Sequence, residues 1–395
     1  MHKWWIAVFL FLYPVSKITA QDSTPSKDTV DVLTILRHIF GKPEKKNPPR
    51  FAILPAVGFN PTFGFTVGVN VTGVFHAMRD TNNRTSSVFF NSFYSTKKNI
   101  NLQLRQNIFF GKNKYYWLGN TQIAQLITET FKPLNEDDIY PVKYGALKFN
   151  HRVYRQIAGH FYGGAGVAFE LYRKIDDEKL NVPENQLTPH YNYSVTKGFD
   201  TSKYATSGFM LALLYHTQEH PLRAYSGWFI DLWVRFNTTW LGSAKNQSMF
   251  FTDIRKYISL SNRNPEHVLA FWNLTALNIS GDLPFLALPA TGLDLYNRSG
   301  RAYAMGRFRG NDYFYLESEY RFPITRRKLL SGVAFINMQT VSLEGQYSLF
   351  DRISPSAGAG LRLLINKRTR SNLCFDYGIG LDGKSGIFFG LNEVF

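Results

Sequence analysis

Charged residues that could pair with one another gather near residue 300. The sequence GRAYAMGRFRGNDYFYLESEYRFPI (300–324) begins with arginines set among glycines and continues to Glu317, Glu319 and Arg321. A guanidinium binds carboxylates through paired hydrogen bonds, and this pairing is strongest where water is partly excluded. We therefore expect an ionic latch between a loop and the carboxylates that follow it. The loop arginines are Arg298, Arg301, Arg307 and Arg309.

The strand that must position the carboxylates alternates charged and apolar residues. In YFYLESEYRFPI (313–324), Glu317, Glu319 and Arg321 share one face of an extended chain. A charge in contact with lipid is costly, so if the apolar face meets lipid, the charged face must line an enclosed lumen. The apolar face carries Phe314, Leu316, Tyr320, Phe322 and Ile324.

The same alternation recurs from residue 51 to the end of the chain, for example in 62–75, 100–110 and 228–240. Hydrophobic residues make up 44% of the sequence, yet no apolar run beyond the N-terminus is long enough for a membrane-spanning helix. Aromatic residues make up 16% and recur near strand ends, as at a lipid boundary. Together these patterns predict a transmembrane β-barrel and exclude helical membrane spans.

We expect sixteen antiparallel strands, which would place both ends of the barrel on the periplasmic side. The long connections 127–143, 176–203 and 281–312 follow odd-numbered strands and would face outward. The turns on the inner side are mostly short and often basic. The expected strands are 51–58, 62–77, 86–99, 100–111, 115–126, 144–158, 159–175, 204–218, 226–241, 248–261, 267–280, 313–324, 329–343, 355–366, 371–381 and 386–395.

The first fifty residues divide into two parts. Residues 1–20 combine an early lysine, a short apolar stretch and a small residue at Ala20, which predicts a cleaved secretory signal peptide. Residues 21–50 are expected to be a periplasmic linker with one short amphipathic helix in VDVLTILRHIF (30–40), docked either on the barrel or on a partner. The linker leaves no room for a folded periplasmic domain, and residues 51–395 form the barrel.

The charge of the chain limits its partners. The formal net charge of +16 becomes +14 when Lys3 and Lys17 leave with the signal, because two positive charges are lost. Outer-membrane lipids, lipopolysaccharide and acidic solutes are suitable partners, and a basic surface loop that attracts lipopolysaccharide is the alternative to a latch. No nucleic-acid partner is expected, because the chain is exported and carries no nucleic-acid-binding motif.

Other residues offer weaker sites. His216 and His220 lie on a strand-to-turn segment without a third ligand nearby, so no metal site is expected. No Gly-x-Ser-x-Gly motif occurs, and neither catalytic residues nor a cofactor are expected. Cys374 is the single cysteine, which excludes an internal disulfide, and we expect it to fill space toward the lumen.

The charged segment resembles the bacterial surface antigen superfamily of outer-membrane β-barrels, which are BamA/TamA-like, in the branch lacking periplasmic POTRA domains. The matching motifs are RAY (301–303), GRFRG (306–310) and EYRFP (319–323). The resemblance implies that the loop between strands 11 and 12 folds into the lumen as a plug, with Ala302 standing in place of the family glycine. The implied latch residues are Arg301, Ala302, Tyr303, Gly306, Arg307 and Arg309.

The resemblance also implies partners for the latch. In the family, strand thirteen carries Phe-x-Asp-x-Gly, whereas here FINMQ keeps Phe335 and replaces the acid with Asn337. Asn337 can accept a hydrogen bond from Arg301 but brings no charge, so we expect the carboxylates to assist. The expected lumen partners are Glu317, Glu319, Arg321, Asn337 and Asp376.

In active superfamily members, the first and last strands meet at a weak seam that opens toward lipid. Here Pro55 lacks a backbone N–H, and the nearby glycines offer no packing side chain. These residues either form a lateral gate or merely shape the ends of the barrel. The terminal Phe395 resembles the residue that outer-membrane assembly machinery reads. The expected seam comprises Pro55, Gly58, Gly386, Gly390 and Phe395.

These observations predict an integral protein in the outer membrane of a Gram-negative bacterium. The resemblance implies a role in inserting or translocating protein or lipid, without chemistry on a substrate. A periplasmic or outer-membrane partner protein would then replace the missing periplasmic domains. A passive channel and a structural subunit of an envelope complex are alternatives, and an outer-membrane lipid enzyme is a less favoured one, because such enzymes can place Ser and His on the barrel exterior.

Overall fold

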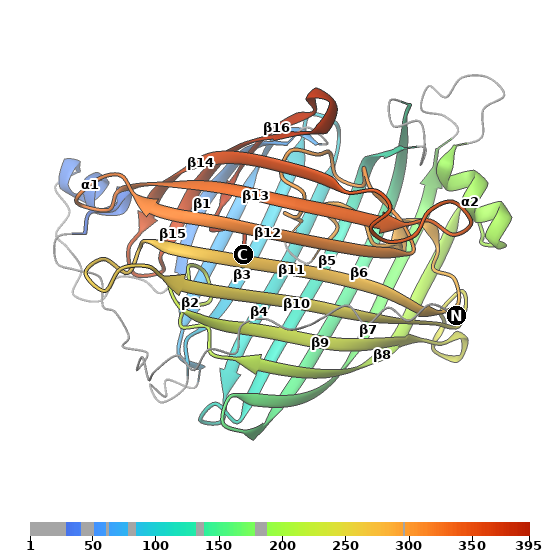
Figure 1. Cartoon of the computed structure of the whole chain (residues 1–395), viewed down its shortest axis with the longest axis horizontal. Helices are drawn as coiled ribbons and strands as arrows, with labels where there is room; N and C mark the ends of the chain where they lie inside the picture. Colours follow the sequence, from blue (N-terminus) through green and yellow to red (C-terminus); the bar gives the residue numbers. More distant parts are fainter. Residues whose placement is uncertain are drawn as a thin grey trace.

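The chain forms one antiparallel β-sheet that curls into a nearly closed barrel (Figure 1). In the part of the chain that the structure describes, sixteen strands follow one another in sequence order, each hydrogen-bonded to the next, so the expected sixteen-stranded antiparallel barrel is confirmed. Two short helices, α1 and α2, lie at opposite ends of the barrel (Figure 1). The computed structural model describes residues 29–40, 51–60, 63–77, 84–131, 138–177, 188–294 and 297–395. The expected signal peptide, residues 1–20, lies outside the described residues.

The elements have the following bounds. The helices are α1 (Val32–Ile39) and α2 (Pro189–Lys197). The strands are β1 (Phe51–Asn60), β2 (Gly64–Phe75), β3 (Ser86–Ser95), β4 (Ile100–Phe110), β5 (Tyr115–Phe131), β6 (Ile139–Ala158), β7 (Phe161–Asp176), β8 (Lys203–His216), β9 (Gly227–Asn237), β10 (Gln247–Ser259), β11 (Val268–Ser280), β12 (Asp312–Pro323), β13 (Leu330–Ser342), β14 (Ser354–Asn366), β15 (Ser371–Gly380) and β16 (Ser385–Leu391).

Side chains alternate between a buried inner face and an exposed outer face. In β12, Glu317 and Glu319 have no exposed surface, whereas Leu316 is 37% exposed. In β13, Phe335 is buried and the next residue, Ile336, is 64% exposed. Apolar side chains on the outer face are stable only against lipid, while the polar inner face is shielded by the barrel itself. No helix in the described part of the chain is long and apolar enough to cross a membrane.

Several strand ends differ from those expected. Strand β3 ends at Ser95, and a four-residue turn with Lys98 at φ 61° separates it from β4, although this turn contains no glycine or proline to announce it. Strands β5 and β6 continue their pairing up to Phe131 and Ile139, beyond the expected ends. The last strand stops at Leu391, so the final four residues lie outside the sheet.

Helix α1 is fastened to one rim of the barrel. Asp31 caps the helix by accepting a hydrogen bond from the Thr34 N–H (2.7 Å), and its second oxygen accepts one from the Lys367 backbone N–H (2.7 Å). Val32 packs against a cluster that contains Leu391, at the end of β16. The helix therefore docks on the barrel, which is one of the two placements expected from the sequence; the other was docking on a partner. Its exposed apolar side chains are Leu36, Ile39 and Phe40.

The sheet is weakest where its two ends approach each other. Every other neighbouring pair of strands forms a ladder, but among the described residues no ladder joins β16 to β1. Strand β16 has only seven residues, whereas its partner β15 has ten. A short edge strand makes few backbone hydrogen bonds, so this seam is the place where the wall can part at least cost.

Placing a charge on the outer face should destabilise the barrel only where that face meets hydrocarbon. We expect Ile336→Lys, in the middle of β13, to lower the free energy of unfolding in lipid vesicles by about 2–4 kcal/mol. The matched control is Ile353→Lys, in the exposed β13–β14 connection, which should change it by less than about 0.5 kcal/mol. Urea titration followed by gel mobility measures the free energy of unfolding of both variants. Equal losses of stability in the two variants would contradict the assigned membrane face.

Candidate functional site: the loop latch and the barrel seam

Arg301 lies at the centre of a buried group of carboxylates. The β11–β12 loop (residues 281–311) brings its guanidinium to Glu317 and Glu319 on β12, with 2.6 Å between Nη2 and Glu319 Oε2. Nη1 lies 3.0 Å from Asp376 Oδ2 on β15. The ring of Phe335 lies under the guanidinium, 3.6 Å from its central carbon. Only 2% of Arg301 is exposed, so these carboxylates supply nearly all of its electrostatic stabilisation.

The ion pairs continue from Arg301 to the C-terminal end of the chain. Arg362 on β14 pairs with Asp376 and, through Nε, with Glu393 Oε2 at 2.8 Å. Glu393 also lies 3.4 Å from Arg223 Nε in the β8–β9 turn. Because these groups are all buried, the loop, β14, β15 and the C-terminal tail (residues 392–395) share one ionic network.

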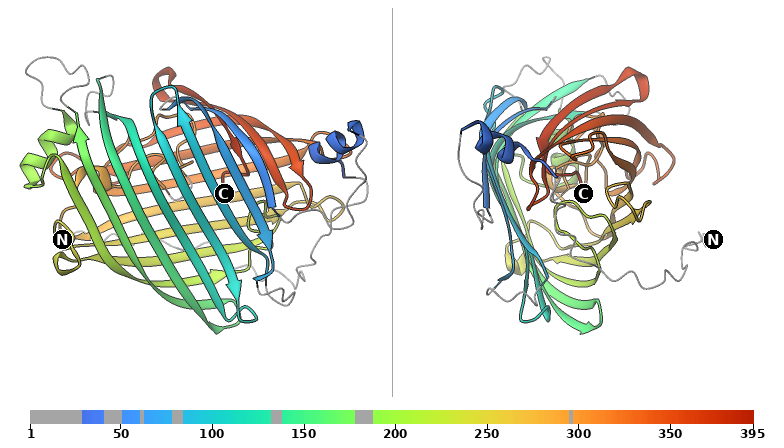
Figure 2. Two further views of the ribbon diagram at one scale, coloured as in Figure 1. Left: turned by 180° about the vertical axis from the view of Figure 1, so that it is seen from behind. Right: turned by 90° about the vertical axis from the view of Figure 1, so that its left-hand side faces the viewer.

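The C-terminal tail turns into the barrel. Phe395 stacks on Trp272 with 5.1 Å between ring centroids, and its main-chain oxygen accepts a hydrogen bond from Arg321 (2.9 Å). Figure 2 (right) shows the C-terminus within the ring of strands. The expectation that Phe395 belongs to the last strand at the seam is therefore wrong. Asn392, with φ 68°, redirects the chain just after β16.

A second loop arginine holds the tail where it leaves β16. Arg298 Nη1 donates to the carbonyl oxygens of Asn392 (2.7 Å) and Glu393 (2.6 Å). Nη2 donates to the carbonyl oxygen of Leu391, the last residue of the strand. These are carbonyls that a neighbouring strand would otherwise satisfy. The loop thus stabilises the free end of the sheet directly.

Glycines on β15 let the loop tip lie flat against the inner wall. A Cβ at Gly380 would come within 2.5 Å of the Tyr303 ring, and one at Gly378 within 3.0 Å of the Arg301 carbonyl oxygen. Tyr303 fits above them, donating its hydroxyl hydrogen to the Pro355 carbonyl oxygen (2.6 Å). Any larger residue would push the tip away from the wall.

Ala302 adopts a backbone conformation that suits glycine. Its φ is 119°, in a region that residues with a Cβ rarely occupy, and its side chain is 3% exposed. The contacts of Arg301 and Tyr303 on either side hold this conformation in place. The alanine therefore stores strain at the tip without displacing it.

Asn337 does not act as expected. The sequence predicts that it accepts a hydrogen bond from the Arg301 side chain, but its amide nitrogen lies 3.5 Å from the Arg301 main-chain oxygen and 3.5 Å from Glu317 Oε2. Ser356, which the sequence did not single out, donates its hydroxyl hydrogen either to that same main-chain oxygen (2.8 Å) or to Asn337 Oδ1 (2.7 Å). Asn337 and Ser356 therefore hold the backbone of the tip, and the charge of Arg301 is balanced elsewhere.

The other latch residues lie apart from the ionic network. The Arg307 guanidinium sits 5.1 Å from the Phe131 ring of β5, and Gly306 takes φ 81° beside it. Arg309 donates to the Phe285 carbonyl oxygen (2.8 Å) within the same loop. These residues shape and anchor the outer part of the loop. They do not help to neutralise the carboxylates.

The seam residues border the same cavity as the latch. A Cβ at Gly58 would lie 3.5 Å from the Phe389 carbonyl oxygen, so β1 and β16 approach each other there. One at Gly390 would lie 3.5 Å from Arg298 Nη2, and one at Gly386 3.5 Å from the Ala302 carbonyl oxygen. A cavity of about 400 Å³ is lined by Pro55, Gly58, Arg298, Arg301, Phe388 and Gly390.

Arg362, Glu393 and Arg223 belong to the site but were not foreseen. Arg362 and Glu393 do carry a signal, since each is a charge within or next to a strand that is otherwise apolar. Arg223 lies in a polar turn, where a charged residue is ordinary, so the sequence gives no signal for it. Among the described residues, no group of three or more His, Cys, Asp or Glu side chains is arranged to hold a metal ion.

Removing the Arg301 charge should be strongly destabilising. We expect Arg301→Met to lower the free energy of unfolding by about 3–5 kcal/mol, because three buried carboxylates lose the counter-charge that they share. Arg352→Met, in an exposed connection, is the control and should change it by less than about 0.5 kcal/mol. Adding Glu317→Gln to Arg301→Met should restore part of the loss. No restoration would mean that packing rather than charge is responsible.

Replacing Ala302 with glycine should stabilise the loop tip. Glycine accepts φ 119° without a Cβ clash, and we expect Ala302→Gly to raise the free energy of unfolding by about 1 kcal/mol. Ala304→Gly, in the same loop at a residue without positive φ, should instead leave the stability unchanged or lower it. Thermal melts of the purified proteins compare them, and a lower melting temperature for Ala302→Gly would contradict the assigned strain.

Comparisons with known proteins identify the fold. No family model and no curated protein matches the sequence. Among solved structures, BamA from Haemophilus ducreyi lacking POTRA domains 1–3 is similar with a TM-score of 0.56 and 16% identity, over 88% of this chain and 71% of that one. CdiB from Escherichia coli is similar with a TM-score of 0.58 and 9% identity, over 89% of this chain and 63% of that one. CdiB from Acinetobacter baumannii is similar with a TM-score of 0.53 and 12% identity, over 87% of this chain and 59% of that one.

The chain therefore spans less than two thirds of the CdiB chains it matches. The likeness covers nearly all of the barrel in each case, and it agrees with the sixteen-stranded order and the outward apolar face. This chain has the fold of a BamA-like outer-membrane β-barrel.

Proposed function

We propose that this barrel helps to insert or translocate protein or lipid at the outer membrane, without catalysing a reaction on its substrate. The observation that carries the proposal is the seam between β1 and β16, which lacks a ladder among the described residues. A wall that can part at one place gives a hydrocarbon-facing exit that a fully hydrogen-bonded barrel lacks. The similarity of the fold to BamA and CdiB barrels supports the same role.

The ionic network is the element that would control this exit. Arg298 holds the end of β16, and Arg301 holds the tip of the same loop to β12 and β15. If the loop withdraws, the carbonyls of Leu391, Asn392 and Glu393 lose their donor. The free end of β16 then needs a new partner, and an incoming β-strand can supply one by pairing along this edge.

A partner protein would act at the α1 rim. Leu36 and Ile39 on α1 are 42% and 68% exposed, and Phe40, just after the helix, is 70% exposed. Val32 stays packed near the end of β16. A periplasmic or outer-membrane partner that covers these side chains would sit next to the seam. Lipids and lipopolysaccharide would surround the outer apolar face.

Locking the seam should stop the proposed activity. In a Cys374→Ser background, Val57→Cys is combined in turn with Ile387→Cys and Phe389→Cys, since all three positions lie on the edge strands of the seam. Vesicles containing the oxidised protein should no longer accelerate the folding of an unfolded outer-membrane barrel, and a reductant should restore the acceleration. The loss is expected to be at least tenfold, because the exit cannot form.

The control pair lies on strands that are already joined. Leu213→Cys and Leu232→Cys face each other on β8 and β9, and their disulfide should leave the activity unchanged. Full activity of the locked seam would overturn the proposal. A large, steady conductance of the unmodified protein in planar bilayers would instead favour a passive channel, because a latched loop should keep the lumen nearly closed.

A further inference from the structure

A row of amide side chains lines the inner wall of β2 to β5, away from the ionic network. Asn91 donates to Asn70 (2.6 Å), Asn101 donates to Asn91 (3.1 Å) and Gln122 donates to Asn101 (2.7 Å). Gln103 donates to Asn120 (2.9 Å) beside this row. Each amide offers both a donor and an acceptor, so the wall can bind groups that also do both.

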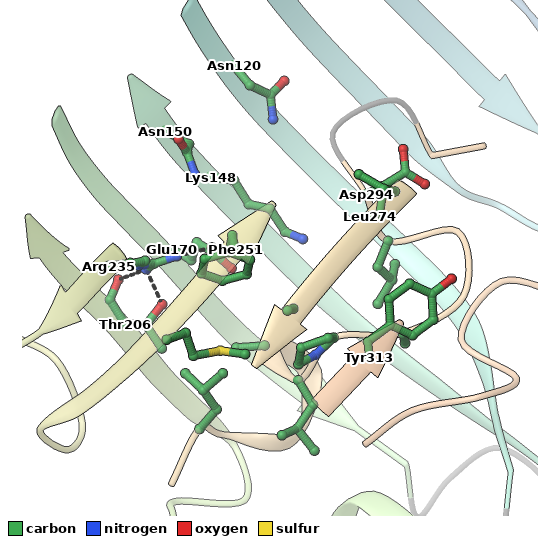
Figure 3. A pocket seen from close by; sticks show the side chains of 18 of the residues that line it. Asn120, Lys148, Asn150, Glu170, Thr206, Arg235, Phe251, Leu274, Asp294 and Tyr313 are labelled. Carbon is green, nitrogen blue, oxygen red and sulfur yellow. Dashed lines mark hydrogen bonds and ion pairs between the residues drawn. The ribbon is translucent and has the colours of Figure 1, made fainter. Parts of the chain in front are cut away.

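Two adjoining cavities separate this wall from the loop. One has a volume of about 210 Å³ and the other about 400 Å³, and both are lined by Gln103, Gln122, Lys148, Leu293 and Asn297. The larger cavity lies in the size range of small-molecule sites, and the smaller one adjoins it. Figure 3 shows Lys148 and Asn150 projecting from one strand into the smaller cavity, with Asp294 and Tyr313 across it.

The ammonium group of Lys148 lacks a direct partner in this cavity. The nearest carboxylate, Glu170, is already bound by Arg235 (2.6 Å) and by the Tyr172 hydroxyl (2.8 Å). Within the described part of the chain, Lys148 forms no hydrogen bond or ion pair, and its closest ring contact is Tyr172 at 5.5 Å. Glu170 attracts the Lys148 charge but forms its direct ion pair with Arg235, so the Lys148 ammonium has no carboxylate of its own. An added anionic group beside it would balance this buried charge.

We propose that these cavities form a binding site for a small acidic saccharide, a sugar that carries a carboxylate or a phosphate. Lys148 binds the acidic group, and the amides of Gln103, Asn120, Gln122 and Asn150 bind hydroxyls. Hydroxyls both donate and accept, as these amides do. Phe251 and Leu274 also line the smaller cavity, where their apolar side chains can pack against the apolar face of a sugar.

The shape of the cavities favours a sugar over an acidic peptide. A peptide that crosses the barrel needs a continuous passage, whereas here the β11–β12 loop closes the space with Leu286, Leu288 and Leu293. A ligand of one or two sugar rings needs no such passage. The larger cavity also reaches the seam and Arg301, but the polar side chains proposed to bind the sugar lie on β4 to β6. The sugar site therefore stands or falls separately from the proposed insertion or translocation role.

Calorimetric titration of the purified full chain in detergent micelles tests the proposal. The probes are digalacturonic acid, glucose 6-phosphate, the neutral sugar maltose and a triglutamate peptide. Either acidic sugar should bind at least tenfold more tightly than maltose and triglutamate, and the binding should weaken as salt is added. Tighter binding of triglutamate would overturn the sugar assignment, and no binding of either acidic sugar at millimolar concentration would overturn the site.

Matched lysine variants locate the binding. Lys148→Met should weaken the binding of the acidic sugar at least tenfold. Lys143 is an exposed lysine on the same strand, and Lys143→Met should leave this binding unchanged. Gln122→Leu should weaken both acidic and neutral sugars, because it removes a hydroxyl partner and leaves Lys148 in place. Equal binding by Lys148→Met and the unmodified protein would refute the role of the ammonium, provided that thermal melts show both proteins folded.

Discussion

The structure depends on balancing charges that the barrel encloses. Glu317, Glu319 and Arg321 face inward because β12 must present its apolar side chains to lipid, and once inside they have little water to solvate them. Arg301 has to come from elsewhere in the chain to neutralise the two carboxylates and Asp376. The position of the loop, the use of glycine at Gly378 and Gly380 beneath its tip, and the strain at Ala302 all follow from that requirement.

The same requirement connects the loop to the end of the sheet. Arg362 shares Asp376 with Arg301 and extends the network to Glu393, so the C-terminal tail is held inside the barrel rather than added to β16. Because the tail does not continue the strand, β16 is short, and the carbonyl oxygens at its end accept hydrogen bonds from Arg298. The weakness of the seam and the strength of the latch are therefore two results of one arrangement of charges.

Much of the fold follows from the sequence because membrane strands obey a strict alternation. Glu317 and Leu316 could be assigned to opposite faces from parity alone, and the number of strands followed from counting such runs. Parity says nothing about where a strand ends without glycine or proline, so the end of β3 was expected at residue 99 but lies at Ser95. It also cannot show that Phe395 leaves the sheet, since that depends on Trp272 and Arg321, which are distant in sequence.

The inner wall of the barrel divides into two regions with different chemistry. Around Arg301 the charges are matched and tightly packed, which favours a single rigid arrangement. Along β2 to β6 the side chains are mostly amides, and Lys148 brings a charge that the described chain does not pair. A latch needs complete pairing within the protein, whereas a binding surface needs groups left over for a ligand. The two regions therefore suit two separate tasks, and a ligand at the amide wall would contact the loop through Leu293 and Asn297 without breaking its ion pairs.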